Sequence, residues 1–337
     1  MANMANDIDF VLLWVDGSDK DWHREKSKYV PGYNADDSIV RYRSWDNLQY
    51  WFRGVEKYAP WVRKIHFITP GHFPSWLNKQ HEKLNCINQN EFIKKEYIPV
   101  FNSNAIELNL HRIESLSEKF VLFCDDMFIL NKVKESDFFK NGLPCDQAIM
   151  NCIIPLRVFS YTDFNNTCVI NKHFNKKEVI KNNILKWFNP AYGIQNFNNI
   201  LFYPWRGIPR FISSHLPIPH LKKTFREVWD IEYQSLDKTS QDKFRSKENL
   251  THWLFRYWRL MKGEFIPSRS LGKKFGISDN KKYNASIYKA ISKQKYRIIC
   301  VNDDEDGVDM NIDFETEKKN LKNAFEHIFP KKSSYEL

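Results

Sequence analysis

The strongest constraint in this sequence is a short apolar run that ends in two adjacent carboxylates. Phe120 to Cys124 reads FVLFC, which is long enough for a strand, too short for another helix and too apolar for a surface loop. Asp125 and Asp126 follow directly, where a buried strand meets its loop. Because ligands of open α/β sheets bind at the carboxyl ends of the strands, this position favours a functional site. The alternative is a solvated turn in which Asp126 caps the next segment.

Adjacent carboxylates repel each other, so a positive partner is expected beside them. Mg²⁺ prefers one or two protein carboxylates together with phosphate oxygens and water, which makes a metal–diphosphate complex one solution. A last apolar strand is predicted at Tyr296 to Val301, and Asp303 follows its end. If the two strands are neighbours, Asp303 joins the acidic pair. Asp125 and Asp303 are therefore the candidate ligands of a Mg²⁺ or Mn²⁺ ion.

The order of patterns along the chain predicts the fold class. Apolar runs at residues 8–15 and 64–69 read as strands, and apolar residues at helical spacing follow Ser44 and Asn104, with Glu107 completing a capping-box pattern. Alternation of strands and helices favours a parallel sheet with right-handed crossovers. We predict an α/β fold: a Rossmann-like, mostly parallel sheet with flanking helices and a mostly helical or irregular insertion.

Changes in composition divide the chain into four parts. We predict that residues 1–155 form the first part of the α/β catalytic core and that residues 213–310 form its second part. Residues 156–212 are rich in Asn, Lys and aromatic residues and are interrupted by prolines, so we predict an insertion that builds the acceptor region. Residues 311–337 form a C-terminal amphipathic helix and tail.

Two stretches suit contacts with a phosphorylated ligand. Asp16 to Asp19 ends the first strand, where Gly17 lets a loop approach a ligand and Asp16 suits ribose hydroxyls or a metal; plain turn chemistry is the alternative. The polar residues 21–39 predict a loop over the end of that strand. Arg41 and Arg43 precede a helix, and a guanidinium beside a helix amino terminus is a good phosphate site. The alternative is that Arg41 and Arg43 are two surface arginines that bind no phosphate.

His215 opens the stretch HLPIPH, in which prolines stiffen an irregular segment. A histidine held in this way can be aimed at a substrate, whereas a lone loop histidine is usually a solvated surface group. His220, at the start of the next helical pattern, suits a cap or a surface position.

The net charge of +10 implies an anionic partner: a nucleotide, a phosphorylated glycan or a membrane surface. No nucleic-acid-binding signature accompanies the charge, so we predict no nucleic-acid partner. The six cysteines lack zinc spacing, which favours a reduced compartment. The amino terminus lacks a signal-peptide pattern, and no stretch approaches about 18 apolar residues. We therefore predict a cytoplasmic protein.

Four blocks of sequence resemble the Stealth family of phosphotransferases. This family includes bacterial capsule hexose-1-phosphate transferases and the catalytic part of the animal GlcNAc-1-phosphotransferase. The blocks are IDFVLLWVDGSD at 8–19, the stretch from RYRSWDN to FVLFCDDMF at 41–128, HLPIPHLKKTFREVW and KFRS within 215–246, and ICVND at 299–303. Together they span nearly the whole chain. Cys124 is a departure, because the animal relatives carry a polar residue at that position.

The resemblance implies transfer of a hexose or N-acetylhexosamine 1-phosphate from a UDP-sugar to a hydroxyl of a glycan or phosphoglycan acceptor. The products would be a phosphodiester and UMP, with a divalent cation as cofactor, in bacterial capsule or surface polysaccharide synthesis. Peripheral association with the inner membrane or with capsule-assembly proteins is left open. The family's essential acidic position falls on Asp126, its H-x-P histidine on His215, and its phosphate-region arginines on Arg41 and Arg245. The remaining candidates for donor contacts are Asp16, Gly17 and Asn104.

Attack of a hydroxyl on the β-phosphorus needs charge neutralisation, in-line positioning and removal of a proton. Imidazole is the natural base, and Asp126 either shares that role or holds the histidine in its productive tautomer. The main alternative is a metal-dependent glycosyltransferase that makes a glycosidic bond and releases UDP. A carbohydrate-binding or assembly subunit without turnover is a second alternative.

Overall fold

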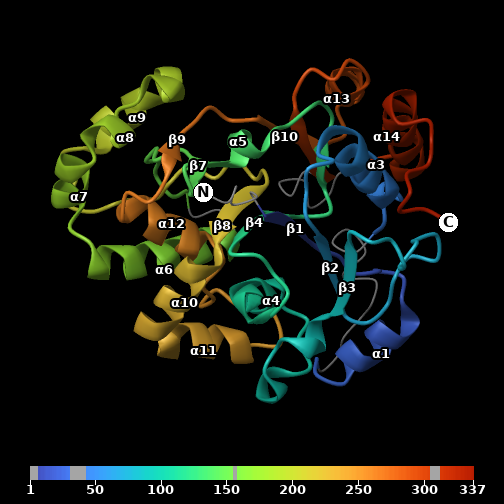
Figure 1. Ribbon diagram of the computed structural model, residues 1–337, viewed down its shortest axis with the longest axis horizontal. Helices are drawn as coiled ribbons and strands as arrows, with labels where there is room; N and C mark the ends of the chain where they lie inside the picture. The colour runs from blue at the N-terminus through green and yellow to red at the C-terminus, as the bar shows by residue number, and fades with distance from the viewer. Residues whose placement is uncertain (1–6, 31–42, 155–157, 304–311) are drawn as a thin grey trace, which may run out of the picture.

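A five-stranded sheet forms the centre of the molecule (Figure 1), which the computed structural model describes over residues 7–30, 43–154, 158–303 and 312–337. The strand order is β3-β2-β1-β4-β8. Strands β1 to β4 run parallel to one another, and β8 is antiparallel to β4. The predicted mostly parallel sheet is confirmed. The bounds are β1 Ile8–Leu13, β2 Ile65–Thr69, β3 Leu84–Asn88, β4 Lys119–Phe123 and β8 Ile218–Leu221.

A second sheet begins immediately after β4. The chain turns at residues 124–126 and enters β5, which pairs with β11 in the sheet β10-β11-β5. The acidic pair therefore lies where the chain leaves one sheet for another. A small third sheet has the order β6-β7-β9. The bounds are β5 Met127–Ile129, β6 Phe139–Lys140, β7 Leu143–Asp146, β9 Ile266–Pro267, β10 Gly272–Ile277 and β11 Ile298–Asp303.

Helices cover both faces of the central sheet (Figure 1). Strand β1 is apolar on both sides, as expected for a buried parallel strand: Phe10 packs into one core and Val11 into the other. Each core thus belongs to one face. The first core is closed by α3 Leu48–Tyr58, α13 Lys281–Ser292 and α14 Phe314–Ile328. The second is closed by α4 Ser103–Leu108, α10 Lys222–Ile231, α11 Tyr233–Gln241 and α12 Trp253–Met261.

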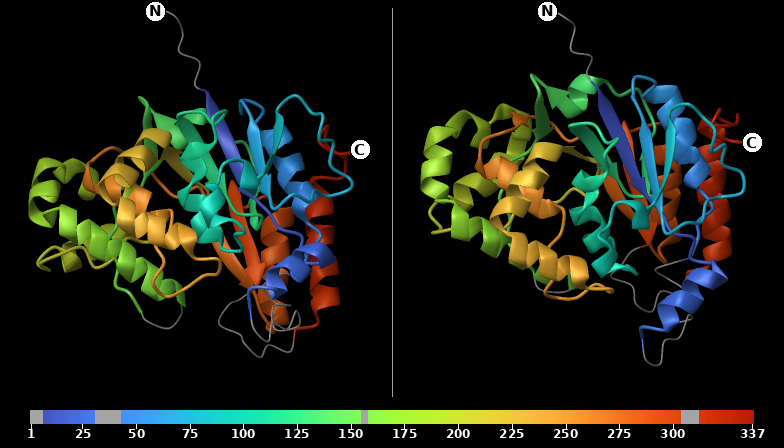
Figure 2. Two further views of the ribbon diagram at one scale, coloured as in Figure 1. Left: turned by 90° about the horizontal axis from the view of Figure 1, so that it is seen from below. Right: turned by 60° about the horizontal axis from the view of Figure 1, so that its bottom comes forward.

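The predicted insertion is mostly helical where the structure describes it, and it extends the second core (Figures 1 and 2). Its helices lie at the end of the molecule opposite α14. None of the described helices is long and apolar enough to cross a membrane. The helices of this segment are α6 Val158–His173, α7 Lys176–Asn182, α8 Ile184–Trp187, η5 Pro190–Gln195 and α9 Asn196–Phe202. The other short helices are α1 Lys20–Ser27, η2 Gln89–Glu91, η3 Lys95–Tyr97, η4 Leu110–Arg112 and α5 Glu135–Phe138.

The predicted helix after Asn104 is wrong in its start and its length. Asn102 is the N-cap, and its side chain accepts a hydrogen bond from the Asn104 backbone N–H at 3.1 Å. The helix ends at Leu108, because the Asn109 side chain bonds back to the Ala105 carbonyl at 2.8 Å and competes with the helical ladder. The predicted capping box is also wrong, since the carboxylate expected to close it bonds instead to a buried histidine ahead of α12.

Three further expectations are corrected. The helix expected from Ser44 begins only at Leu48. The predicted loop at 21–39 contains most of α1, because the Asp19 carboxylate accepts a hydrogen bond from the Trp22 N–H at 2.7 Å and caps that helix. His220 is 1% exposed in β8 and is neither a cap nor a surface residue. Strand β3 was not predicted, because its sequence LNCIN lacks a clear apolar pattern.

A buried carboxylate ties the start of the central sheet together. Asp9 in β1 is completely buried and accepts hydrogen bonds from Arg63 Nε at 2.8 Å, His66 Nε2 at 2.9 Å and the Ser117 N–H at 2.7 Å. Burial alone would raise the pKa of Asp9, but the bonds from His66 and Arg63 hold it below its ordinary value. The group is therefore charged and joins β1, β2 and the approach to β4.

Removal of the Asp9 charge is expected to destabilise the fold. In Asp9→Asn the guanidinium and imidazole lose their anionic partner, so we expect a loss of about 3–5 kcal/mol in urea unfolding at neutral pH. Because the folded pKa lies below the ordinary value, the stabilisation is present above that value and is lost as the pH falls through the folded pKa. The difference in unfolding free energy between the wild type and Asp9→Asn should therefore become smaller at acidic pH.

A surface carboxylate provides the control for this measurement. Glu248 forms an exposed pair with Lys238, so Glu248→Gln should unfold at the same urea concentration as the wild type. Equal stability of Asp9→Asn and the wild type would contradict the role assigned to the buried charge.

Candidate active site

Asp126 joins three segments that are far apart in the sequence. It lies in the turn between β4 and β5, and its backbone carbonyl accepts a hydrogen bond from the Val301 N–H of β11 at 2.9 Å. Its Oδ2 atom lies 3.3 Å from His215 Nε2 and 3.3 Å from Cys300 Sγ. The two residues expected to be catalytic, Asp126 and His215, are thus in direct contact.

The Asp126 carboxyl group is held in its charged form. Burial alone would raise its pKa, but hydrogen bonds from His215 and Cys300 and the nearby Lys274 charge bring it below the ordinary value. A charged carboxylate only accepts hydrogen bonds, so His215 Nε2 is the donor and Nδ1 is the basic nitrogen. The other carboxylate oxygen, Oδ1, is buried and has no hydrogen-bond partner among the described residues.

The backbone of His215 adopts a conformation that few side chains tolerate. Its φ angle is +45°, in the left-handed region, which costs of the order of 1–3 kcal/mol for a residue that is not glycine. The next residue, Leu216, is buried, and β8 follows at Ile218. The His215 side chain is 34% exposed. This strained segment presents the imidazole to Asp126 while leaving it open to a substrate.

The two expected metal ligands, Asp125 and Asp303, have different surroundings. Asp125 is exposed in the turn. The Asp303 carboxylate is bound by Arg43, whose Nε lies 3.1 Å from Oδ2. A different set of side chains brings its metal-ligand atoms within 4.8 Å of one another in the described part of the chain: Cys124, Asp126 and His215.

The donor atoms at this position suit an oxygen-binding cation. Burial and the Asp126 charge raise the pKa values of Cys124 and Cys300 well above the ordinary thiol value, so both thiols are neutral. Asp126 Oδ1 and Asn302 Oδ1 are both buried and unpartnered within the described ranges, and they stand on neighbouring segments. Carboxylate and amide oxygens are ligands that Mg²⁺ and Mn²⁺ accept. The residues present therefore fit a divalent cation.

Two cations contribute to the electrostatics of the acidic turn. Arg245 donates from Nη2 to Ser103 Oγ, and its charge acts on the thiol that precedes the acidic pair. Lys274 lies in β10 opposite Cys300, and its charge acts on Asp126. Sequence reasoning missed Lys274, although the strand pattern GKKFGI was available as a signal. The amide at position 302, within the ICVND block, was also missed as a site residue.

The remaining candidates for donor contacts lie in different surroundings. Arg41 lies outside the described residues. Asn104 is buried in the first turn of α4, directly after the serine that accepts from Arg245. The Asp16 carboxylate accepts a hydrogen bond from the backbone two residues later at 2.8 Å, so it forms a local turn. Gly17 does not adopt a positive φ angle.

A pocket of about 390 Å³ opens at the carboxyl ends of β1, β2 and β3. Trp22 and Phe101 provide aromatic walls, with their ring centroids 5.8 Å apart. Gln89, Asp19 and His72 add polar groups. This volume falls within the range of small-molecule sites, and the position matches the strand ends where α/β sheets bind ligands.

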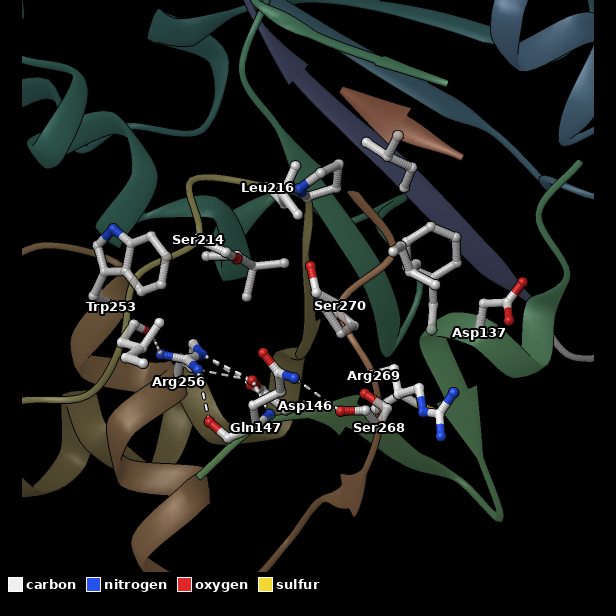
Figure 3. A pocket seen from close by; sticks show the side chains of 18 residues that line it. Asp137, Asp146, Gln147, Ser214, Leu216, Trp253, Arg256, Ser268, Arg269 and Ser270 are labelled. Atoms are coloured by element: carbon white, nitrogen blue, oxygen red, sulfur yellow. Dashed lines mark hydrogen bonds and ion pairs between the residues drawn. The ribbon is translucent and has the colours of Figure 1, made fainter. Parts of the chain in front are cut away.

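A smaller pocket of about 70 Å³ lies beside the segment that carries His215 (Figure 3). Leu216 and Trp253 line it, and Figure 3 shows Arg256 pointing toward Asp146. Arg256 Nη2 lies 2.8 Å from the Asp146 carboxylate. The pocket is below the size of ordinary ligand sites, so it does not hold a sugar ring by itself.

Comparison with known proteins defines the class. Residues 6–34 match the profile described as Stealth protein CR1, conserved region 1, and residues 41–146 match Stealth protein CR2, conserved region 2. The capsular polysaccharide phosphotransferase WcwK of Streptococcus pneumoniae is 45% identical over 343 residues, covering 100% of this chain and 99% of the relative. The exopolysaccharide phosphotransferase cps2G of Lactiplantibacillus plantarum is 38% identical over 332 residues, covering 98% and 96%.

A third relative also matches over nearly its full length. The receptor polysaccharide phosphotransferase WefC of Streptococcus oralis is 37% identical over 342 residues, covering 98% of this chain and 100% of the relative. The α/β fold and these full-length similarities define a phosphotransferase enzyme. The chain belongs to the Stealth family.

The two histidines of the HLPIPH stretch should respond differently to substitution. His215→Ala removes the imidazole beside Asp126, so we expect transfer to fall by roughly 10²–10⁴ while the protein stays folded. His220→Ala leaves a hole in the core, so it should lower the melting temperature while the activity of the folded fraction remains. Rates and thermal melts of both variants are the measurements. A fully active His215→Ala would remove the catalytic role from this residue.

Proposed function

We propose that this enzyme transfers a sugar 1-phosphate from a UDP-sugar to a hydroxyl of a glycan acceptor. The acceptor oxygen forms a bond to the β-phosphorus, and the bond from that phosphorus to the oxygen bridging the two phosphates breaks. UMP leaves with the bridging oxygen, and a phosphodiester remains. The direct contact between Asp126 and His215, on an acidic turn to which two cations contribute positive charge, is the observation that carries this proposal.

The larger pocket supports a nucleotide donor. Trp22 and Phe101 would contact the uracil, and the polar groups around Asp19 suit ribose hydroxyls. Phe101 lies two residues before Ser103, the partner of Arg245. A base in this pocket would therefore place its diphosphate near the guanidinium.

His215 would act as the general base. Its Nε2 atom donates to Asp126, which fixes the tautomer and leaves Nδ1 to take the proton of the acceptor hydroxyl. The negative Asp126 then stabilises the imidazolium that forms. Arg245 and Lys274 would bind the phosphate oxygens and lower the repulsion between the donor and the acidic turn.

A Mg²⁺ or Mn²⁺ ion would be held by Asp126 Oδ1, with Asn302 and Asp125 as further oxygen ligands. Such an ion neutralises phosphate charge when it is bound. Asp303 would become a ligand only by giving up its pair with Arg43. The residues of the protein itself, and not the ion, would orient the base and bind the donor.

The biological setting is inferred from the relatives and from the chain. Relatives are named as capsular, exopolysaccharide and receptor polysaccharide phosphotransferases, and we extend capsule or surface polysaccharide synthesis to this protein. All six cysteines are free, which supports a reducing, cytoplasmic setting. The net charge of +10 supports association with anionic glycans or a membrane surface.

Product analysis tests the reaction. Incubation with a UDP-sugar, a glycan acceptor and Mg²⁺ or Mn²⁺ should yield UMP and a phosphodiester, and excess EDTA should abolish both because the phosphate charge is no longer neutralised. Chromatography of the nucleotides and phosphorus NMR of the glycan are the measurements. UDP with a glycosidic bond would show a glycosyltransferase instead, and full turnover in EDTA would remove the metal from the proposal.

Arg245 should require its forked guanidinium. Arg245→Lys keeps the charge but loses the fork, so we expect the transfer rate with the UDP-sugar to fall by at least about tenfold. Arg226→Lys, in a surface pair with Glu118, is the matched control and should keep wild-type kinetics. Steady-state rates and melts of both variants decide the matter: wild-type donor kinetics in Arg245→Lys would show that this residue does not bind the diphosphate.

A further inference from the structure

Exposed apolar residues are concentrated in α8, η5 and α9 and in the residues just after α9, and together they form what we call the apolar patch. Sixteen large hydrophobic residues are exposed among the described residues, and eight of them fall within residues 184–205. Exposed hydrophobic residues are normally scattered singly, and a concentrated patch marks an interaction site. The helices α8 and α9, which carry most of these residues, lie at the end of the molecule opposite α14 (Figure 1). The eight members of the patch are Ile184, Leu185, Ile194, Phe197, Ile200, Leu201, Tyr203 and Trp205.

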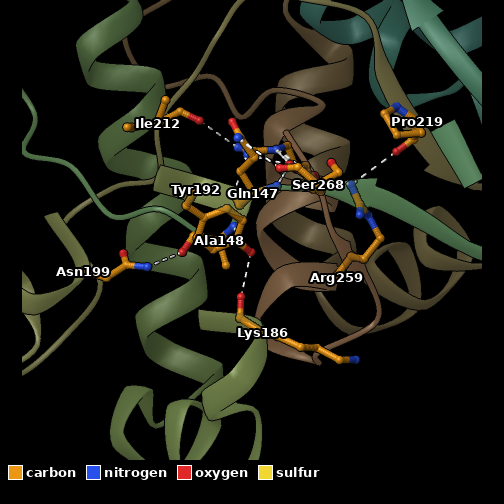
Figure 4. A network of polar contacts seen from close by, with 11 residues as sticks. Gln147, Ala148, Lys186, Tyr192, Asn199, Ile212, Pro219, Arg259 and Ser268 are labelled. Carbon is orange, nitrogen blue, oxygen red and sulfur yellow. Dashed lines mark hydrogen bonds and ion pairs between the residues drawn. The ribbon is translucent and has the colours of Figure 1, made fainter. Parts of the chain in front are cut away.

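Buried residues and hydrogen bonds fix the helices that carry the patch to the rest of the protein. In α9, Asn199 and Phe202 are buried, whereas the apolar residues around them are exposed. Asn199 Nδ2 donates to the Ala148 carbonyl at 2.7 Å, a contact shown in Figure 4. The Tyr192 hydroxyl donates to the Lys186 carbonyl at 2.6 Å. Because these polar contacts hold the helices in place, the apolar exposure is not a consequence of a frayed helix.

Exposure within the patch follows the chemistry of the side chains. The aliphatic Ile194 and Leu185 protrude most, at 83% and 79% exposed. Tyr203 and Trp205, whose rings carry a polar atom, are less exposed, at 44% and 53%. Proteins that lie in a membrane interface place aliphatic groups deepest and amphipathic rings at the headgroup level.

The segment that carries the patch contains mainly positive charges. Residues 176–207 contain four lysines and one arginine against a single acidic residue, Glu178. Lys177, Lys181 and Arg206 are exposed. This balance complements an anionic surface, and it opposes contact between two copies of the same face.

We propose that this patch binds the surface of a bilayer that contains anionic phospholipid. The apolar side chains of α8, η5 and α9 insert at the headgroup boundary, and the exposed cations contact the lipid phosphates. The proposal goes beyond the transfer reaction and does not rest on it, because binding needs neither donor nor acceptor.

Vesicle sedimentation of the full chain tests the proposal. The wild type should bind vesicles of phosphatidylcholine mixed with phosphatidylglycerol more strongly than vesicles of phosphatidylcholine alone. Phe197→Glu combined with Leu201→Glu should weaken this binding by about tenfold or more, since two apolar contacts become anionic. Ile231→Glu, which alters a 48% exposed residue of α10 outside the patch, is the matched control and should bind as the wild type does.

Each other outcome overturns the proposal. Absence of binding to the anionic vesicles, or equal loss in the Ile231→Glu control, would exclude the patch as a lipid site. A wild-type dimer that the double variant dissociates, without lipid binding, would assign the patch to a second copy. Melts confirm that the double variant is folded, and vesicle binding is measured without donor or acceptor, so failure of lipid binding stays distinguishable from failure of the transfer reaction.

Discussion

The two sheets meet at the partly buried carboxylate of Asp126, which is held in its charged form. A charge in this position is costly unless hydrogen bonds and nearby cations offset the loss of water. His215, Cys300 and Lys274 supply that compensation, and each comes from a different element. The backbone of the same residue also accepts the Val301 N–H, which joins the turn to the second sheet. The site is therefore assembled by the same contacts that join the two sheets.

The charge arrangement around this carboxylate explains why the turn suits phosphate chemistry. Two neutral thiols occupy the space beside it, so the negative charge is concentrated on the carboxylates. Arg245 and Lys274 contribute positive charge to the surroundings of the turn. In the proposed reaction, a phosphorylated donor would meet these cations, and the acidic oxygens would remain for a metal ion or for the base. Neither group of charges would serve this purpose alone.

The sequence was sufficient for the elements that carry strong local patterns. The apolar runs predicted β1, β2, β4 and β11, and the H-x-P resemblance placed His215 in one site with Asp126. Residues whose roles depend on pairing across the fold were not predictable in this way. Arg43 was expected at a phosphate, but it binds Asp303, 260 positions away. The role of Lys274 depends on the register of β10 with β11, which no local pattern specifies.

The apolar patch and the segment that carries His215 are joined through the short piece of chain that follows β7. Asn199 of α9 bonds to Ala148 in this piece, and the next residue accepts the N–H of Ile212, three residues before His215. Arg256 bonds both to the end of β7 and to the Ile212 carbonyl. Because these contacts are buried and paired, a surface that fixes α9 also fixes the approach to His215. Attachment of the patch to a bilayer, as proposed, would therefore also orient His215 relative to that bilayer.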